Sequence, residues 1–267
     1  FVSLVLQKTY TVSKSAIVPS TVRLDTELVE ANSKLGLIAG LTGAVAVLPA
    51  AILLKLVGAP ATLVYGALLF VGAFVAATRL PSEVVASDAA DAEETRELHT
   101  SNIEMAAIAM TVLRALVGFT FFHLAFWLRS QDQGTVWFAA VVGLSALAAM
   151  AGNAVASSVR VHVREETMLS ISLLVCAAAG LGVAVLGGPI GAVVLAGVLN
   201  LMAALGRLSF ESIVQRDAPG ANQGRAFAVF ETRFQLAWAL GAFTAVASRA
   251  PGPIGFLVVG LAAAGAS

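Results

Sequence analysis

Long apolar stretches separated by shorter polar ones run through most of the chain. Each stretch approaches the about 20 residues that an α-helix needs to cross the hydrocarbon layer of a bilayer. The stretches are continuous, rich in Ala, Leu and Gly, and show no alternation of apolar and polar positions, which argues against membrane β-strands. The pattern therefore predicts an all-α, polytopic transmembrane helical bundle. The predicted spans cover residues 35–57, 61–79, 103–128, 135–157, 167–187, 189–208, 225–248 and 252–267.

Two kinds of connection alternate between these spans: short Gly/Pro turns and longer polar loops. Basic residues sort with the longer loops: ten Lys and Arg residues lie in these loops or at the span ends beside them, whereas only Lys55, Arg129 and Arg249 lie at the other end of the spans. By the positive-inside rule, the longer loops are predicted to be cytoplasmic. The short turns lie at 57–61, 187–191 and 248–255, and the longer loops lie at 14–34, 80–102, 158–166 and 209–225.

One loop differs from the others. Residues 82–102 carry six acidic residues and a single Arg, without an apolar period, which is typical of a linker. Ser101 and Glu104 near its end match the capping box that opens many helices. The linker divides the chain into a front part (1–81) with two full spans and a rear part (103–267) with six.

Composition narrows the functional class. With 58% hydrophobic and 12% charged residues, the chain has too little polar surface for a soluble protein of its length. Sixteen basic and sixteen acidic residues give a net charge of zero, so no nucleic-acid partner is implied. The sequence contains no catalytic motif, phosphate-binding loop or metal-spaced Cys/His set, so we predict no enzyme activity, cofactor or metal. The lone Cys176 and the ladder Gly36, Gly40 and Ala44 are predicted to serve packing.

Three polar side chains inside the predicted spans are candidates for a substrate path. Arg114 lies roughly 16 Å along the helix axis from Ile103, near mid-depth, where it needs a carboxylate, a water path or an anionic substrate. The alternative is that this helix projects into the cytoplasm and that Arg114 anchors packing near the interface. His123 is either a proton relay or, more commonly for a single membrane histidine, a packing residue. Asn200 either bonds within the bundle or faces a cavity.

Two opposite charges lie just inside the span that begins near Arg225. Glu231 and Arg233 are two residues apart, so about 200° of helical rotation places them on opposite faces and prevents them from pairing. The favoured interpretation makes Arg225, Glu231 and Arg233 interfacial and structural, with Arg207 or Arg216 as the partner of Glu231. The alternative places Glu231 on a water-filled path with Gln235, which joins the substrate-path candidates.

Three segments resemble a known family. "SAIVPSTVRLDTELVEANSKL" (15–35), "LRALVGFTFFHLAFWLR" (113–129) and especially "RLSFESIVQRDAPGANQGRAFAVFETRFQLAWALGA" (207–242) are similar to an actinobacterial branch of the major facilitator superfamily. The resemblance implies twelve helices in two six-helix halves that carry small molecules by alternating access. It also implies that this chain runs from late helix four to helix twelve, with an incomplete N-terminal half and a truncated last helix.

These observations lead to one functional hypothesis and one rival. The hypothesis is a secondary active transporter in the bacterial plasma membrane that moves a small amphipathic molecule, with efflux as the expected direction and a proton as a candidate coupling ion. We expect a monomer in the lipid bilayer. The rival is a membrane sensor or assembly scaffold that transports nothing.

Overall fold

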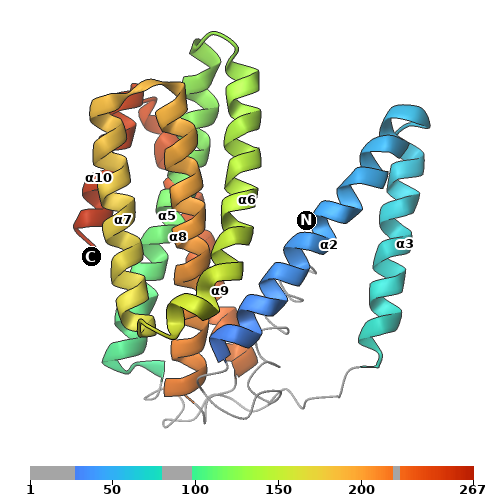
Figure 1. The fold of residues 1–267 in the computed structure, drawn as a ribbon, viewed down its shortest axis with the longest axis horizontal. Helices are drawn as coiled ribbons and strands as arrows, with labels where there is room; N and C mark the ends of the chain where they lie inside the picture. The colour runs from blue at the N-terminus through green and yellow to red at the C-terminus, as the bar shows by residue number, and fades with distance from the viewer. Residues whose placement is uncertain (1–27, 80–97, 219–222) are drawn as a thin grey trace.

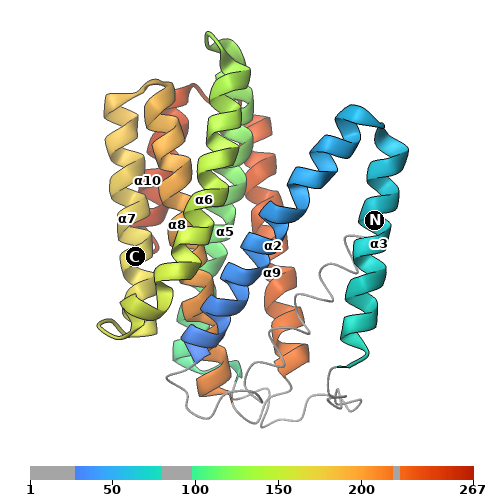
Figure 2. The same cartoon turned by 45° about the vertical axis from the view of Figure 1, so that its right-hand side comes forward.

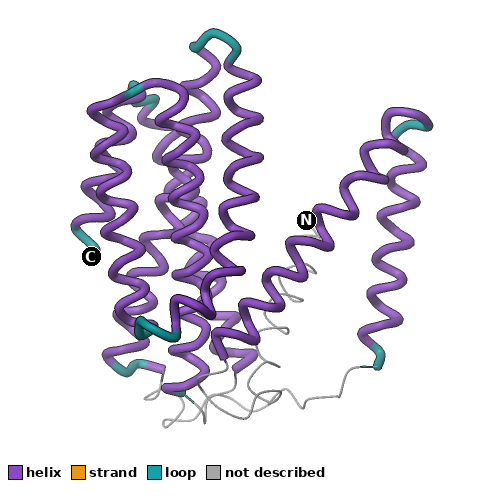
Figure 3. The backbone as a smooth tube through the Cα atoms, viewed as in Figure 1, coloured by secondary structure: helices purple, strands orange, loops and turns teal. Residues whose placement is uncertain are grey.

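The computed structural model of the protein describes residues 28–79, 98–218 and 223–267. Within these ranges the chain forms long helices joined by short turns, with no strand (Figure 3). The predicted all-α class is confirmed. The segment before residue 28 and most of the predicted linker lie outside the described residues. The helices are α2 (Leu28–Leu56), α3 (Ala59–Ala77), α5 (Ser101–Trp127), a 3₁₀ turn η2 (Leu128–Ser130), α6 (Gly134–Arg160), α7 (Glu165–Leu186), α8 (Gly188–Asp217), α9 (Gln223–Ser248) and α10 (Gly252–Ala264).

Glycine and proline set the short turns, as the sequence predicts. Gly58, before α3, has a φ of 109°, and Gly187 and Gly188, between α7 and α8, have φ values of 68° and 79°. Glycine adopts this region without the steric cost that a Cβ imposes. Pro60 lies in the first turn of α3 and Pro251 is the N-cap residue of α10, where a missing amide proton costs little.

Helices α5 to α10 pack into one bundle of roughly parallel and antiparallel helices (Figures 1 and 2). The most extensive contacts pair α5 with α9, α6 with α8, and α7 with α10. Large apolar side chains such as Phe210, Phe256 and Leu113 are fully buried between them. The outer surface is also apolar, with exposed Leu147 and Phe243, which suits contact with hydrocarbon rather than with water.

Helices α2 and α3 stand to one side of this bundle, and α2 meets it near the end at which the chain leaves α3 and enters α5 (Figures 1 and 2). We call this end the linker end. Gly36 and Gly40 face Asn153 and Met150 of α6, and a Cβ added at either glycine would lie 2.9 Å from the facing side chain. The predicted close helix contact is therefore confirmed at these two glycines. Near them, the Ser33 hydroxyl donates to the Asn153 carbonyl.

Two helices, α2 and α8, extend far beyond the predicted spans. Helix α2 begins at Leu28, within the predicted loop 14–34, and α8 continues to Asp217, through most of the predicted loop 209–225. Phe210, Ile213 and Val214 of this extension are fully buried. The loop predictions were wrong because hydropathy marks residues that meet lipid, whereas a helix continues past the apolar layer when protein covers its end.

The predicted capping box at the start of α5 does not form. The helix begins at Ser101, so Thr100 is the N-cap residue, and no side chain makes a capping hydrogen bond there. The Glu104 amide donates to the Thr100 carbonyl at 3.0 Å, which is an ordinary backbone bond of the first turn. A helix that starts one residue early moves serine out of the capping position.

Six of the eight described α-helices, α2, α3 and α5 to α8, are long and apolar enough to cross a membrane. Helix α10 has 13 residues. Helix α9 has 26 residues, but it carries Glu231, Arg233 and Gln235 within its length. Since lipid cannot satisfy such groups, each of them needs a partner in the protein or contact with water.

Candidate functional site

A polar cavity of about 380 Å³ lies where α2 meets the bundle. Its walls come from α2, α5, α6 and α8, so segments distant in the sequence build it jointly. We call it the central cavity. Polar and charged side chains in its walls are Asn32, Arg114, Asn153, Asn200, Arg207 and Glu211.

Arg114 lies at the midpoint of α5, as far from Ser101 as from Trp127. Its Nε atom is buried and has no hydrogen-bond partner among the described residues. The guanidinium is attracted by Glu231 and Glu211 and repelled by Arg207. Arg114 therefore lies at mid-helix, and its side chain lines the central cavity. A guanidinium at this depth costs a few kcal/mol unless partners or water compensate it.

Three further charges surround Arg114. Arg207 Nε donates to Glu211 Oε1 at 2.8 Å, one turn along α8. On α9, Gln235 Nε2 donates to Glu231 Oε1 at 2.7 Å, and Glu231 also attracts Arg207. Arg114, Arg207, Glu211 and Glu231 together form what we call the charged cluster, with two positive and two negative side chains from three helices.

Asn200 lines both the central cavity and a second, smaller cavity. Its Nδ2 donates to the Ala196 carbonyl at 2.9 Å, one turn back on α8. The second cavity has a volume of about 180 Å³ and shares Val117 and Asn200 with the first. Its other walls are mostly apolar, and we call it the apolar chamber. They comprise Thr120, Phe121, Leu124, Val141, Val142, Ser145, Ala196, Leu199 and Trp238.

His123 lies away from both cavities, although the sequence made it a path candidate. It is 3% exposed, and its ring lies parallel to Phe119 at 5.5 Å and edge-on to Phe256 of α10 at 5.6 Å. A Cβ on Gly255 would overlap the ring. This geometry favours the packing alternative, in which the imidazole joins α5 to α10.

Glu231 and Arg233 face different surroundings, as their spacing predicts. Glu231 belongs to the charged cluster, whereas Arg233 is exposed and lines a groove of about 490 Å³ between α5 and α9, together with Arg225, Glu104 and His99. The interfacial interpretation therefore fits Arg225 and Arg233. It does not describe Glu231, whose electrostatic neighbours line the central cavity.

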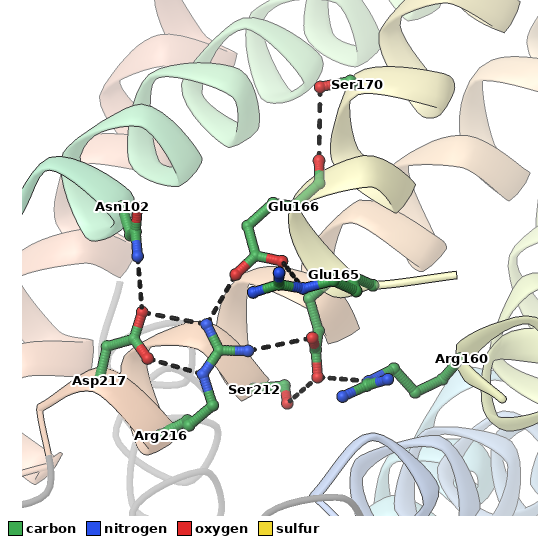
Figure 4. Close-up of polar contacts among 9 residues, drawn as sticks. Asn102, Arg160, Glu165, Glu166, Ser170, Ser212, Arg216 and Asp217 are labelled. Atoms are coloured by element: carbon green, nitrogen blue, oxygen red, sulfur yellow. Dashed lines mark hydrogen bonds and ion pairs between the residues drawn. The ribbon is translucent and has the colours of Figure 1, made fainter. Parts of the chain in front are cut away.

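A second group of charges joins the linker ends of α6, α7 and α8 (Figure 4). Arg216 donates to Glu165 at 3.1 Å, to Glu166 at 2.7 Å and to Asp217 at 2.6 Å. Arg160 donates to Glu165 at 2.5 Å. We call these five residues the terminal network. It ties the ends of three helices together by charge-assisted hydrogen bonds.

Sequence reasoning missed the terminal network and the cavity residues Asn32, Asn153 and Glu211. The signals available were the acidic first turn of α7 and the basic last turns of α6 and α8, which complement the helix dipoles. Glu211 follows Arg207 by four residues, the spacing at which helical side chains pair. Both signals were hidden because the terminal network and Glu211 were predicted to lie in the loops 158–166 and 209–225.

No group of three or more His, Cys, Asp or Glu side chains suited to a metal ion occurs among the described residues. The family model described as Major Facilitator Superfamily matches residues 7–242 of the chain. Among curated proteins, none matches the sequence significantly.

Proposed function

Because this chain belongs to the major facilitator superfamily of multi-pass membrane transporters, we propose that it exports small amphipathic molecules by alternating access. The single observation that carries the proposal is the charged cluster, in which Arg114, Arg207 and Glu211 line the central cavity and Glu231 interacts with both arginines. Charged groups at membrane depth are costly, and they are retained where they line a substrate or ion pathway. A transporter needs such a pathway, and a protein that only spans the membrane does not.

The proposed moving parts are the front region (1–81) and the rear region (103–267), joined by a linker at 82–102. In support, α3 packs chiefly on α2, and α2 meets the rear bundle mainly through α6 and α8. The central cavity lies at this contact. Rocking of one region against the other would expose the cavity to alternate sides of the membrane.

Glu231 is the proposed proton carrier, because its carboxylate interacts with the guanidinium groups of Arg114 and Arg207. Both arginines line the central cavity. Protonation would remove its negative charge and leave Arg114 and Arg207 with fewer counter-charges. The local field at the cavity would then change with the proton, which is the basis of coupling in proton-driven carriers.

The proposed location is the bacterial plasma membrane, in a monomer of the actinobacterial branch of the family, with the linker end of the bundle in the cytoplasm. Ten basic residues in or beside the longer loops, against three at the opposite turns, support this orientation. Arg160, Arg216 and Arg225 all lie at the linker end.

Orientation is testable by cysteine labelling in intact cells. In a Cys176→Ala background, cysteines introduced at Ser87 and Ala221 should resist a membrane-impermeant maleimide, while a cysteine at Ser130 should react. The expected reactivity at all three positions follows from the distribution of basic residues. Cys176 is buried, so its replacement removes background without disturbing the surface. Labelling at Ser87 and Ala221 but not at Ser130 would invert the proposed topology.

Transport is testable with the full-length protein in proteoliposomes. We expect uptake of at least one compound from a panel of amphipathic acids, bases and neutral molecules, and faster uptake with an imposed proton gradient. Glu231→Gln should lower the gradient-driven rate at least tenfold at equal amounts of inserted protein, because it abolishes the titrating carboxylate while keeping the side-chain shape.

Arg233→Gln is the matched control for this experiment. It removes a charge from the same helix two residues away, on a side chain that lies outside the charged cluster, so the rate should stay within about twofold. Equal rates for wild type and Glu231→Gln would contradict the proton-carrier role. Absence of movement for every compound would contradict transport itself.

A further inference from the structure

The two adjoining cavities present opposite chemistry. The central cavity presents Arg114, Arg207 and Glu211, and the apolar chamber presents aromatic and aliphatic side chains such as Phe121 and Trp238. Val117 and Asn200 belong to both linings, so the two spaces adjoin. A molecule that filled both would need one polar end and one apolar end.

Three buried polar groups on α5 lack hydrogen-bond partners among the described residues: Nε of Arg114, the hydroxyl of Thr120 and Nε2 of His123. Of these residues, Arg114 and Thr120 line the two cavities, whereas His123 lies in the aromatic contact with α10. Arg114 lines the central cavity and Thr120 lines the apolar chamber. Six residues separate them, which is about 9 Å along the helix axis. A buried donor without an acceptor costs about 1–3 kcal/mol, and more when it is charged, so a ligand that supplies the acceptor gains that energy.

The hydrogen bonds within the charged cluster indicate which charge a ligand group must carry to bind Arg114. Arg207 donates to Glu211, and Gln235 donates to Glu231, so each carboxylate already accepts a hydrogen bond. Arg114 alone among these residues keeps a buried donor without a partner in the described structure. A guanidinium with an open donor binds carboxylates best, because its planar fork matches both oxygens.

We infer that the cavity pair binds an amphipathic organic carboxylate, with its carboxylate on Arg114 and its apolar body in the chamber beside Trp238. This inference rests on the proposed transport function and adds the sign of the ligand charge, the ligand length of about 9 Å set by Arg114 and Thr120, and the orientation of the ligand. Apolar walls supply affinity, and the few polar groups fix the pose.

Binding of three matched probes to the purified full-length protein tests this inference. The probes are 4-phenylbutyrate, 4-phenylbutanamide and 4-phenylbutylamine, which share a skeleton and differ in charge. Isothermal titration calorimetry should show the carboxylate binding at least tenfold more tightly than the amide and the amine. Arg114→Gln should reduce carboxylate binding to the level of the amide and leave the amide unchanged, whereas Arg233→Gln should change neither.

Trp238→Leu probes the other end of the ligand. It should weaken the carboxylate and the amide by the same factor, about three- to tenfold, because both lose the same aromatic contact. Equal affinities of the three probes, a preference for the amine, or no binding to wild type would overturn the inference, and these results require no variant to fold.

The two proposals fail in different ways. Movement of other compounds in proteoliposomes, with no preference for the carboxylate in calorimetry, would overturn the inference and leave transport standing. Tight, Arg114-dependent carboxylate binding by a protein that moves no compound would overturn transport and leave the anion site.

Discussion

Replacement of Gly118 by alanine is expected to lower the free energy of unfolding by about 3 kcal/mol, at the upper end of the usual cost of overpacking. A Cβ at Gly118 in α5 would overlap the carbonyl oxygen of Trp238 in α9. Conversely, a Cβ at Gly241 in α9 would overlap the carbonyl oxygen of Ala115. The two helices thus touch backbone to backbone, and neither obstacle can rotate away as a flexible side chain could.

Thermal or denaturant unfolding of the purified protein in detergent would measure this loss. Gly143→Ala and Gly182→Ala are matched controls, because a Cβ at either position would meet nothing within 4 Å. They should be neutral or stabilise the protein by about 0.5–1 kcal/mol, since alanine favours the helix over glycine. Wild-type stability of Gly118→Ala would contradict the close approach of α5 and α9.

The second large effect is expected for Glu165→Ala, which should destabilise the folded protein by about 3 kcal/mol. The Glu165 carboxylate is 1% exposed, lies 2.5 Å from Arg160 and 3.1 Å from Arg216, and accepts a hydrogen bond from Ser212. In this variant, Arg216 would still form ion pairs with Glu166 and Asp217. Arg160, however, has no other ion-pair partner among the described residues. Removing the shared carboxylate therefore leaves a partly buried cation uncompensated.

Arg164→Ala provides the comparison for Glu165→Ala. Arg164 is 76% exposed and lies 3.5 Å from Glu166, so its loss should cost less than about 1 kcal/mol. The same unfolding measurement applies to both variants. A loss from Arg164→Ala as large as that from Glu165→Ala would show that the buried position of Glu165 has no energetic importance.

The helices and their turns could be predicted from sequence because both are local properties. Continuous apolar runs have no stable alternative to the helix in a membrane, and positions such as Gly58 and Gly187 need the backbone freedom that only glycine has. The ends of α2 and α8 were predicted wrongly, since protein contacts rather than lipid cover Leu28 and the residues from Ser209 onward.

The candidate site could be predicted only in part. Arg114 and Asn200 stood out because a charged or amide side chain within an apolar run needs a partner, and both line the central cavity. His123 carried the same signal but lies in an aromatic contact with α10. A polar side chain in a membrane span needs interactions that offset its loss of hydration. The sequence does not reveal whether side-chain packing, a hydrogen-bond partner or a cavity provides them.

By itself, the sequence determined the all-α membrane class, the turn positions and the opposite faces of Glu231 and Arg233, because helical periodicity and hydropathy act over a few neighbouring residues. Only the tertiary structure decided that Glu231 interacts with Arg114 and Arg207, which line the central cavity, while Arg233 lines an outer groove. Electrostatic interaction depends on distance in space, and the packing of α5, α8 and α9 brings together charges that are separated by up to 117 positions in the chain.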